Sequence, residues 1–147
     1  MAKRAYKKSV EQFQKFVDLL GDSDEIAIET FNPDVYWKMI VQGWDNGDGT
    51  RGYGIGVYKD INGDLANDPL FYLSGRLVGG RITELEICSY ESSLLGLFVD
   101  GDGIASMWGS REKDPVGLTR RFASFMDNMS GGPYLDNPKS VVRYPKE

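Results

Sequence analysis

Hydrophobic residues recur along the chain at two spacings, and a spacing of three to four residues predicts a helix over Ser9–Leu20. The hydrophobic positions of this segment are Val10, Phe13, Phe16, Val17 and Leu20. Ser9 and Gln12 have the spacing of a capping box, in which each side chain bonds a free backbone N–H of the first turn. Gly21 follows directly, and a glycine there favours the left-handed backbone that ends a helix.

A second segment near the C-terminus has the same helical spacing. Asp114 is expected to cap it, and Pro115 suits the first helical position because its missing N–H has no partner there. The hydrophobic stripe consists of Leu118, Phe122, Phe125, Met126 and Met129. Gly131-Gly132-Pro133 should end this helix.

Between the two helices, hydrophobic and polar residues alternate, which is typical of half-buried strands. The expected strands are 26–30, 36–44, 52–59, 71–77, 81–90, 94–99 and 104–108. Short, glycine-rich connections between them predict an antiparallel meander. The alternation is uneven around Ile87-Cys88, so this strand should contain a bulge or be covered on both faces.

A hairpin over Tyr53–Leu73 is the centre of this pattern, with the turn pairs Asn62-Gly63 and Asp68-Pro69 between its two arms. The strand 52–59, which contains the first arm, places Gly52, Gly54 and Gly56 on one face, and this leaves that face almost bare. Either the C-terminal helix or a large aromatic side chain should therefore pack closely against it. A nucleotide loop is disfavoured, because no helix follows the glycines and their spacing fits no phosphate-binding motif.

Together these elements predict a single α+β domain over residues 1–147, which is an ordinary size for one domain. We expect an antiparallel meander sheet of about 5–7 strands flanked by an N-terminal helix (about 9–20) and a C-terminal helix (about 115–130). The ends should be a basic arm (1–8) and an extended tail (132–147). No stretch has the length of a membrane span or the pattern of a secretory signal, which indicates a soluble, cytoplasmic protein.

Charge is unevenly distributed. Residues 1–17 carry a net charge of +4, residues 18–114 a net charge of −11, and residues 115–147 a net charge of +2. The acidic middle argues against direct binding of nucleic acid and favours a positively charged protein partner. The alternative is that acidic loops only keep a small domain soluble.

The sequence contains no recognisable catalytic site. There is no histidine, and the single cysteine, Cys88, lies in a hydrophobic alternation and is expected to be a buried, inert side chain. Asp60, Asn62 and Asp64 match the first ligand positions of a calcium loop, but its required glycine and glutamate are missing. We therefore expect no metal, no cofactor and no enzymatic activity, and interpret these residues as turn formers.

The best candidates for a partner-binding site are aspartates in the glycine-rich turns and two tryptophans beside those turns. They are Asp45, Asp48, Asp60, Asp64, Asp68, Asp100, Asp102, Trp44 and Trp108. Exposed aromatic residues ringed by charge are frequent energetic centres of protein interfaces.

The segment Asn62-Gly-Asp-Leu-Ala-Asn-Asp-Pro69 resembles a motif of uncharacterised accessory proteins of plasmids and phages. A weaker similarity extends to Leu19-Leu20-Gly21 and to the aromatic stripe of Phe122–Met129. The resemblance implies a mobile element inside a bacterium and supplies no catalytic residues.

In that context, size and acidity suggest an inhibitor of a host defence nuclease, of the anti-CRISPR or anti-restriction type. Its aspartates would occupy the basic nucleic-acid-binding surface of the target. The alternative is an accessory domain that binds a small ligand or a metal between the bare strand face and the loops. The oligomeric state and the identity of the partner do not follow from the sequence.

Overall fold

The computed structural model describes residues 2–144, which form ten strands and two helices. The first half of the chain contains β1 (Lys3–Arg4), α1 (Lys7–Leu20), β2 (Glu25–Glu29), β3 (Lys38–Asp45), β4 (Thr50–Ile61) and β5 (Asp64–Val78). The second half contains β6 (Arg81–Ser92), β7 (Leu97–Val99), β8 (Ile104–Met107), β9 (Ser110–Lys113), α2 (Leu118–Met129) and β10 (Ser140–Tyr144).

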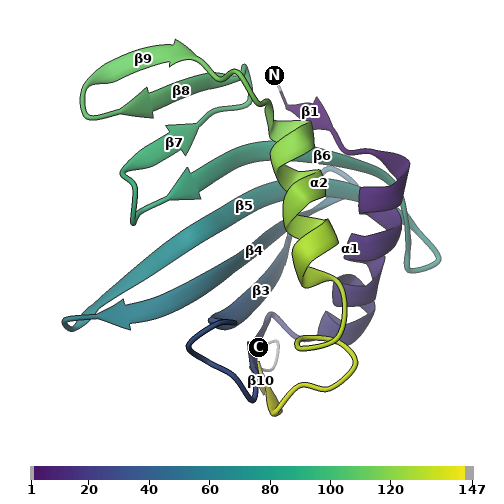
Figure 1. Ribbon diagram of the computed structural model, residues 1–147. Helices are drawn as coiled ribbons and strands as arrows, with labels where there is room; N and C mark the ends of the chain where they lie inside the picture. Colours follow the sequence, from purple (N-terminus) through teal and green to yellow (C-terminus); the bar gives the residue numbers. More distant parts are fainter. Residues whose placement is uncertain (1, 145–147) are drawn as a thin grey trace.

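All ten of these strands belong to one antiparallel sheet, and the two helices cross the same face of it (Figure 1). The order β10-β2-β3-β4-β5-β6-β7-β8-β9 is a meander from β2 to β9, to which the C-terminal strand is added beside β2. The short β1 pairs with β6, where Lys3 lies opposite Ile87. One side of the sheet is thus covered by helices, and the other side is open.

The expected sheet of about 5–7 strands flanked by helices is wrong. The described chain has ten strands, and both helices lie on one side of the sheet instead of flanking it. The three strands that the pattern missed are β1, β9 and β10, which are short and mostly exposed. Strands at a sheet margin bury neither face fully, so their sequences lack the alternation that marks inner strands.

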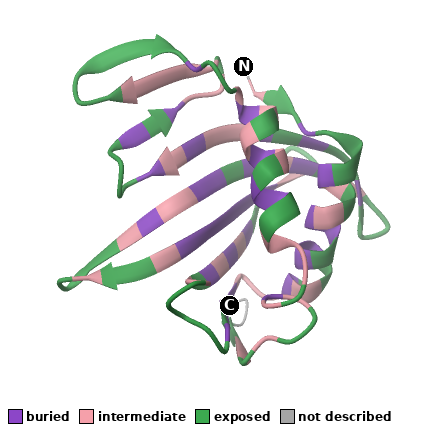
Figure 2. Cartoon of the chain, in the orientation of Figure 1, coloured by how far each residue is buried: buried purple, intermediate pink, exposed green. Residues whose placement is uncertain are grey.

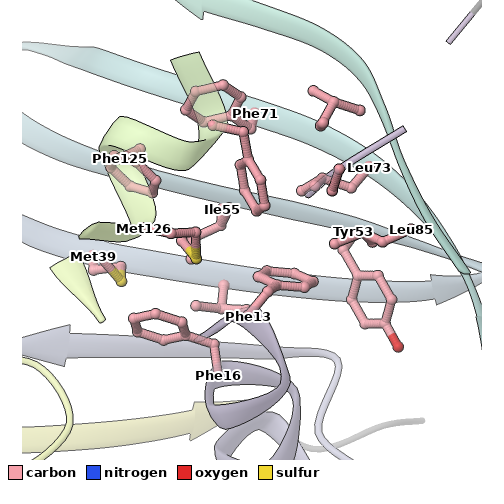
Figure 3. Packing of buried hydrophobic residues seen from close by; sticks show 14 of the residues in the cluster. Phe13, Phe16, Met39, Tyr53, Ile55, Phe71, Leu73, Leu85, Phe125 and Met126 are labelled. Atoms are coloured by element: carbon pink, nitrogen blue, oxygen red, sulfur yellow. The ribbon is translucent and has the colours of Figure 1, made fainter. Parts of the chain in front are cut away.

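The core lies between the helices and the covered face of the sheet (Figures 2 and 3). Phe13 of α1 and Phe122 of α2 meet edge to face, with ring centroids 5.8 Å apart. Phe13 also contacts Tyr53 of β4 at 5.4 Å, and Phe122 contacts Phe71 of β5 at 5.2 Å. Edge-to-face pairs of this kind stabilise a core beyond the burial of their area.

The helix starts differ from the predicted caps. α1 begins at Lys7 with Tyr6 as its N-cap and without a side-chain cap, and Ser9 is buried inside the helix, so the capping box is wrong. α2 begins at Leu118, three residues after the expected Pro115. Gly21 does end α1, with a φ of 55° and its N–H bonded to the Val17 carbonyl.

The central hairpin is longer and tighter than expected. Asn62 and Gly63, with φ values of 54° and 88°, make the whole turn between β4 and β5, and Asp68-Pro69 lies inside β5. The predicted irregularity in β6 is a bulge at Cys88, because Tyr72 pairs with Ser89 and Leu73 pairs with Ile87. Cys88 is only partly buried.

The terminal segments take part in the sheet. Lys3–Arg4 form β1, and Lys7 and Lys8 lie in the first turn of α1. The tail forms β10, whose residues pair with β2 from Ser140 opposite Glu29 to Tyr144 opposite Glu25. Residues 1 and 145–147 of the predicted arm and tail lie outside the described residues.

Candidate protein-binding face

The turn aspartates do not share one surface. Asp45 and Asp48 lie at the β3–β4 turn, whereas Asp60 and Asp64 lie at the β4–β5 turn, at the opposite end of β4. β4 has 12 residues, so these two turns are about 40 Å apart at the usual rise of a strand. Asp68 lies within β5. The structure therefore brings only Asp45 and Asp48 close to Trp44.

Asp100 and Asp102 occupy a third turn, between β7 and β8, with β5 and β6 separating β7 from the first hairpin. Trp108 lies in the turn between β8 and β9, with a φ of 51° and 84% of its surface exposed. Its indole packs beside Gly96, in the neighbouring β6–β7 turn. The two predicted tryptophan anchors are thus on different parts of the molecule.

Several of these aspartates bond the backbone of their own turns. The Asp45 carboxylate accepts the Gly47 N–H at 2.8 Å, and the Asp60 carboxylate accepts the Gly63 N–H at 2.9 Å. The Asp100 carboxylate accepts two such bonds, from Asp102 at 2.9 Å and from Ile104 at 3.1 Å. These contacts are the local side-chain bonds that shape tight turns.

Asp48 has the same role with an added hydroxyl. Its carboxylate accepts the Thr50 hydroxyl and the Thr50 backbone N–H. The hydroxyl bond, followed by the backbone bond, lowers the pKa of Asp48. The acidic residues of the turns are thus explained largely by local backbone geometry.

The open face of the sheet carries a better-defined feature, at the bare stripe of β4. Gly52 pairs with Trp44, and a Cβ atom at Gly52 would lie 2.1 Å from the indole Nε1. The indole therefore lies directly over Gly52. Gly54 is approached by Tyr72, whose ring is 3.5 Å from the corresponding Cβ position. Of the two expected covers for the glycines, the structure shows the aromatic one.

Trp44 and Tyr72 form an exposed aromatic pair. Their ring centroids are 6.2 Å apart, and the two residues are 40% and 38% exposed. The Trp44 indole N–H donates to the Asn46 side chain at 3.1 Å, and Asn46 in turn donates to the Thr50 hydroxyl at 3.0 Å. The indole is thus fixed in place by the turn that follows β3.

Glutamates lie on both sides of this aromatic pair. Glu25 of β2 accepts a bond from the Gln42 amide at 2.8 Å, and the Gln42 carbonyl oxygen lies over Gly54. Burial, followed by the charges of Tyr72, Glu91 and Glu25, raises the pKa of Tyr58 to about 12. The glutamate charges therefore act on the same part of the open face. We call Trp44, Tyr58, Tyr72, Glu25 and Glu91 the open-face patch.

The carboxylates of the open-face patch are not neutralised by neighbouring cations. Lys38 pairs with Glu29 at 3.8 Å, and Arg76 pairs with Glu84 at 3.5 Å. Within residues 2–144, neither Glu25 nor Glu91 has a cation within ion-pair distance. Arg81, at the start of β6, and Arg111, on β9, are two further arginines of the sheet.

Sequence reasoning found Trp44 but missed the rest of the patch. Trp44 stood out because it precedes an acidic turn, whereas Tyr72, Glu25 and Glu91 lie on three other strands. Only the strand register brings them together, and the one signal for it was the bare face of β4. A bare stripe between two strands implies that large side chains of the neighbours fill it.

Comparison with models of known families, with curated proteins and with solved structures finds no match. In residues 2–144, neither helix is long and apolar enough to cross a membrane. The same residues contain no group of three or more cysteine, aspartate or glutamate side chains placed to hold a metal ion. The geometry of the chain is therefore the basis for the function proposed below.

Proposed function

We propose that this protein is a non-enzymatic protein-binding module whose open-face patch contacts a basic surface of a partner protein. The observation that carries the proposal is the exposed Trp44–Tyr72 pair, held over bare glycines and accompanied by two carboxylates without ion-pair partners. Aromatic residues in a rigid setting are the commonest energetic centres of protein interfaces.

Lysine and arginine are the side chains that this patch is suited to bind. A guanidinium can stack on the face of Trp44 or Tyr72, which is favourable because the ring face carries partial negative charge. Glu25 and Glu91 then supply carboxylates for charge-assisted hydrogen bonds. Asp45 and Asp48, which lie in the turn next to Trp44, extend the negative surface at that end of the sheet. Opposite net charges on the two contacting surfaces speed association and make it sensitive to salt.

The narrower form of the proposal is that the partner is a defence nuclease of a bacterial host, met in the cytoplasm. On this view the patch occupies the basic channel in which a CRISPR or restriction effector holds nucleic acid. Support for this form comes from the resemblance of Asn62–Pro69 to accessory proteins of plasmids and phages, and from the acidity of residues 18–114. Asp60, Asp64, Asp100 and Asp102 lie in other turns and are not part of the proposed contact. Asp68 lies on β5 beside the residue that pairs with Tyr58, and it is not assigned to the contact either.

Affinity capture with matched variants tests the proposal. The purified chain is immobilised and exposed to bacterial lysate at low and at high salt, together with Trp44→Ala, Tyr72→Ala and Trp108→Ala. Trp108→Ala is the matched control, because it removes an exposed tryptophan of another turn. We expect a basic protein that binds at low salt and is released at high salt, and that is lost with either patch variant.

Two results would contradict the proposal. One is a specific partner whose binding depends on Trp108 and not on Trp44 or Tyr72. The other is turnover of a substrate by the purified chain. For the narrower form, the isolated partner should be a nuclease or effector complex whose cleavage activity the wild-type chain reduces and Trp44→Ala does not.

A small-ligand function is the second candidate, and a separate observation favours it. A cavity of about 730 Å³ lies at the end of the sheet beside the β3–β4 turn, with an arginine and two aspartates in its wall.

A further inference from the structure

The cavity beside the β3–β4 turn combines charges of both signs. It measures about 730 Å³, and its lining includes Asp24, Asp45, Thr50 and Arg51. Asp24 precedes β2, and the other three residues lie at the end of β3 and the start of β4. Three separate segments of the chain, around β2, β3–β4 and the end of β5, therefore converge on this space.

The Arg51 guanidinium occupies space that a side chain at position 43 would otherwise fill. Gly43, on β3, leaves room for the guanidinium, because a Cβ atom at Gly43 would lie 2.9 Å from Arg51 Nη2. On its other side the guanidinium lies 5.6 Å from the centroid of the Tyr53 ring. Arg51 is only partly exposed, so its position is defined by this packing.

The Arg51 guanidinium nevertheless lacks an acidic partner. Asp45 is its cross-strand neighbour and Asp24 lines the same cavity, yet in residues 2–144 no carboxylate lies within ion-pair distance of it. Within those residues Arg51 also donates no side-chain hydrogen bond. A guanidinium has five N–H donors that suit carboxylate or phosphate.

The Tyr53 hydroxyl beside it is also without a partner. Tyr53 is completely buried, and its hydroxyl has no hydrogen-bond partner among the described residues. Tyr53 pairs with Gly43 and lies two residues after Arg51 on the same face of β4, so two residues of the cavity wall flank it. Figure 3 shows its hydroxyl directed away from the other labelled side chains. An unpaired buried hydroxyl is costly. Tyr53 itself is not among the residues that line the cavity, so the proposed ligand contacts rest on Arg51 and the two aspartates.

We infer that this cavity binds a small zwitterion of the α-amino acid type, with its carboxylate on Arg51 and its ammonium group between Asp24 and Asp45. The carboxylate of the ligand supplies the two acceptor oxygens that the guanidinium lacks within the protein. The two aspartates favour a positive group a few atoms away.

The same charges disfavour other small ligands. Phosphate and other polyanions would meet the aspartates at close range, which costs binding energy in a partly desolvated site. A simple cation could pair with the aspartates but would leave the Arg51 guanidinium without an acceptor. Only a molecule with both charges close together satisfies the three ionised groups at once. This site adjoins the surface proposed for a basic partner protein, because Trp44 and Asp45 belong to both.

Thermal melting and calorimetry with the intact chain test the inference. The probes are a panel of single α-amino acids, with acetate, methylammonium and inorganic phosphate as controls that carry one kind of charge. We expect at least one amino acid to raise the melting temperature and to bind measurably, and none of the three controls to do so. Arg51→Gln should weaken that binding at least about tenfold, since a hydrogen bond to a charged group is lost. Asp24→Asn should weaken it in the same way.

Arg76→Gln is the matched control, because it removes an arginine of the neighbouring strand that already pairs with Glu84. Its affinity for the amino acid should equal that of the wild type. Arg51→Lys keeps the positive charge, and it is the variant to measure if Arg51→Gln fails to fold. The inference is overturned if no amino acid binds the folded wild type, if Arg51→Gln binds as tightly as the wild type, or if phosphate alone binds.

Discussion

Removal of the Asp114 carboxylate should be among the most damaging single changes to this fold. The Asp114 side chain is completely buried, and its two oxygens accept Arg121 Nε at 2.9 Å and Nη2 at 2.8 Å. They also accept the backbone N–H groups of Val116 at 3.3 Å and of Gly117 at 3.0 Å, in the turn that leads into α2. Arg121 lies 4.7 Å from the centroid of the Tyr90 ring on β6. The carboxylate therefore ties α2 to the sheet.

The magnitude follows from what Asp114→Ala leaves behind. The variant keeps a guanidinium that is 20% exposed and two backbone donors that lose their acceptor. Breaking a buried ion pair from one side costs about 3–5 kcal/mol. Because Arg121 retains some contact with water, we expect the lower end, about 3 kcal/mol. For a chain of this length, that corresponds to a fall in melting temperature of roughly 6–12 °C.

Urea denaturation followed by tryptophan fluorescence measures this loss. The control is Glu84→Ala, which removes an exposed carboxylate that contacts Arg4 at 3.4 Å and Arg76 at 3.5 Å. Exposed pairs contribute within about 1 kcal/mol, so this variant should be near the wild type. If Asp114→Ala loses less than about 1 kcal/mol with an unchanged m-value, the carboxylate is not what holds α2 to the sheet.

Three further predictions follow. The hydrogen bond from Arg121 holds the pKa of Asp114 below its usual range. The stabilisation from this carboxylate is therefore present above about pH 4 and is lost as the pH falls through the folded-state pKa. The difference in unfolding free energy between wild type and Asp114→Ala should shrink on acidification, and a constant difference would refute this. Gly52→Val places a side chain where the Trp44 indole lies, so the indole must move out of this position. We expect the fluorescence of Trp44 to shift to the red, with Trp44→Phe in the same background showing the emission of the other tryptophans. Capture of the basic partner should also become weaker. Phe71→Ala empties a fully buried site between the sheet and α2 and should cost about 3–5 kcal/mol in urea, whereas a loss below about 1 kcal/mol would mean that the core closes over the gap.

The elements that sequence reasoning recovers are those that bury one regular face. The stripe of α2, including Phe122 and Met126, has helical spacing because that helix lies on the sheet with one side only. Ile55 and Val57 alternate with glycines because β4 is an inner strand with different environments on its two faces. In such segments burial imposes a period, and the period can be read directly.

The elements that sequence reasoning misses lack that constraint. Ser110–Lys113 is exposed at every position, so nothing in its pattern distinguishes a strand from a loop. Ser9 resembles a helix cap, but contacts in the core extend α1 to Lys7 and bury the serine. Local side-chain preferences at helix ends are worth about 1 kcal/mol, which tertiary packing readily exceeds.

The candidate site also contains residues that the sequence predicts and residues that only the strand pairing shows. The aspartates were predicted as binding residues because they are frequent in the turns. Tight turns, however, need Asp, Asn and Gly for local hydrogen bonds and for positive φ values. Tyr72 and Glu91 carried no such signal, because their importance comes from the strands beside them. Gly43 shows the same dependence, since its role is to leave space for Arg51 across a strand pair. Sites built from strand register become visible only once the pairing is known.

The C-terminal strand has a consequence for how this molecule meets copies of itself. β10 occupies one side of β2, a strand that holds Ile26, Ala27 and Ile28 in succession. A chain that ended before Ser140 would leave the amide and carbonyl groups of β2 unpaired beside this apolar run. Such an uncovered margin is a template for strand addition between molecules. By pairing with this side of β2, β10 protects the apolar run from strand addition between molecules.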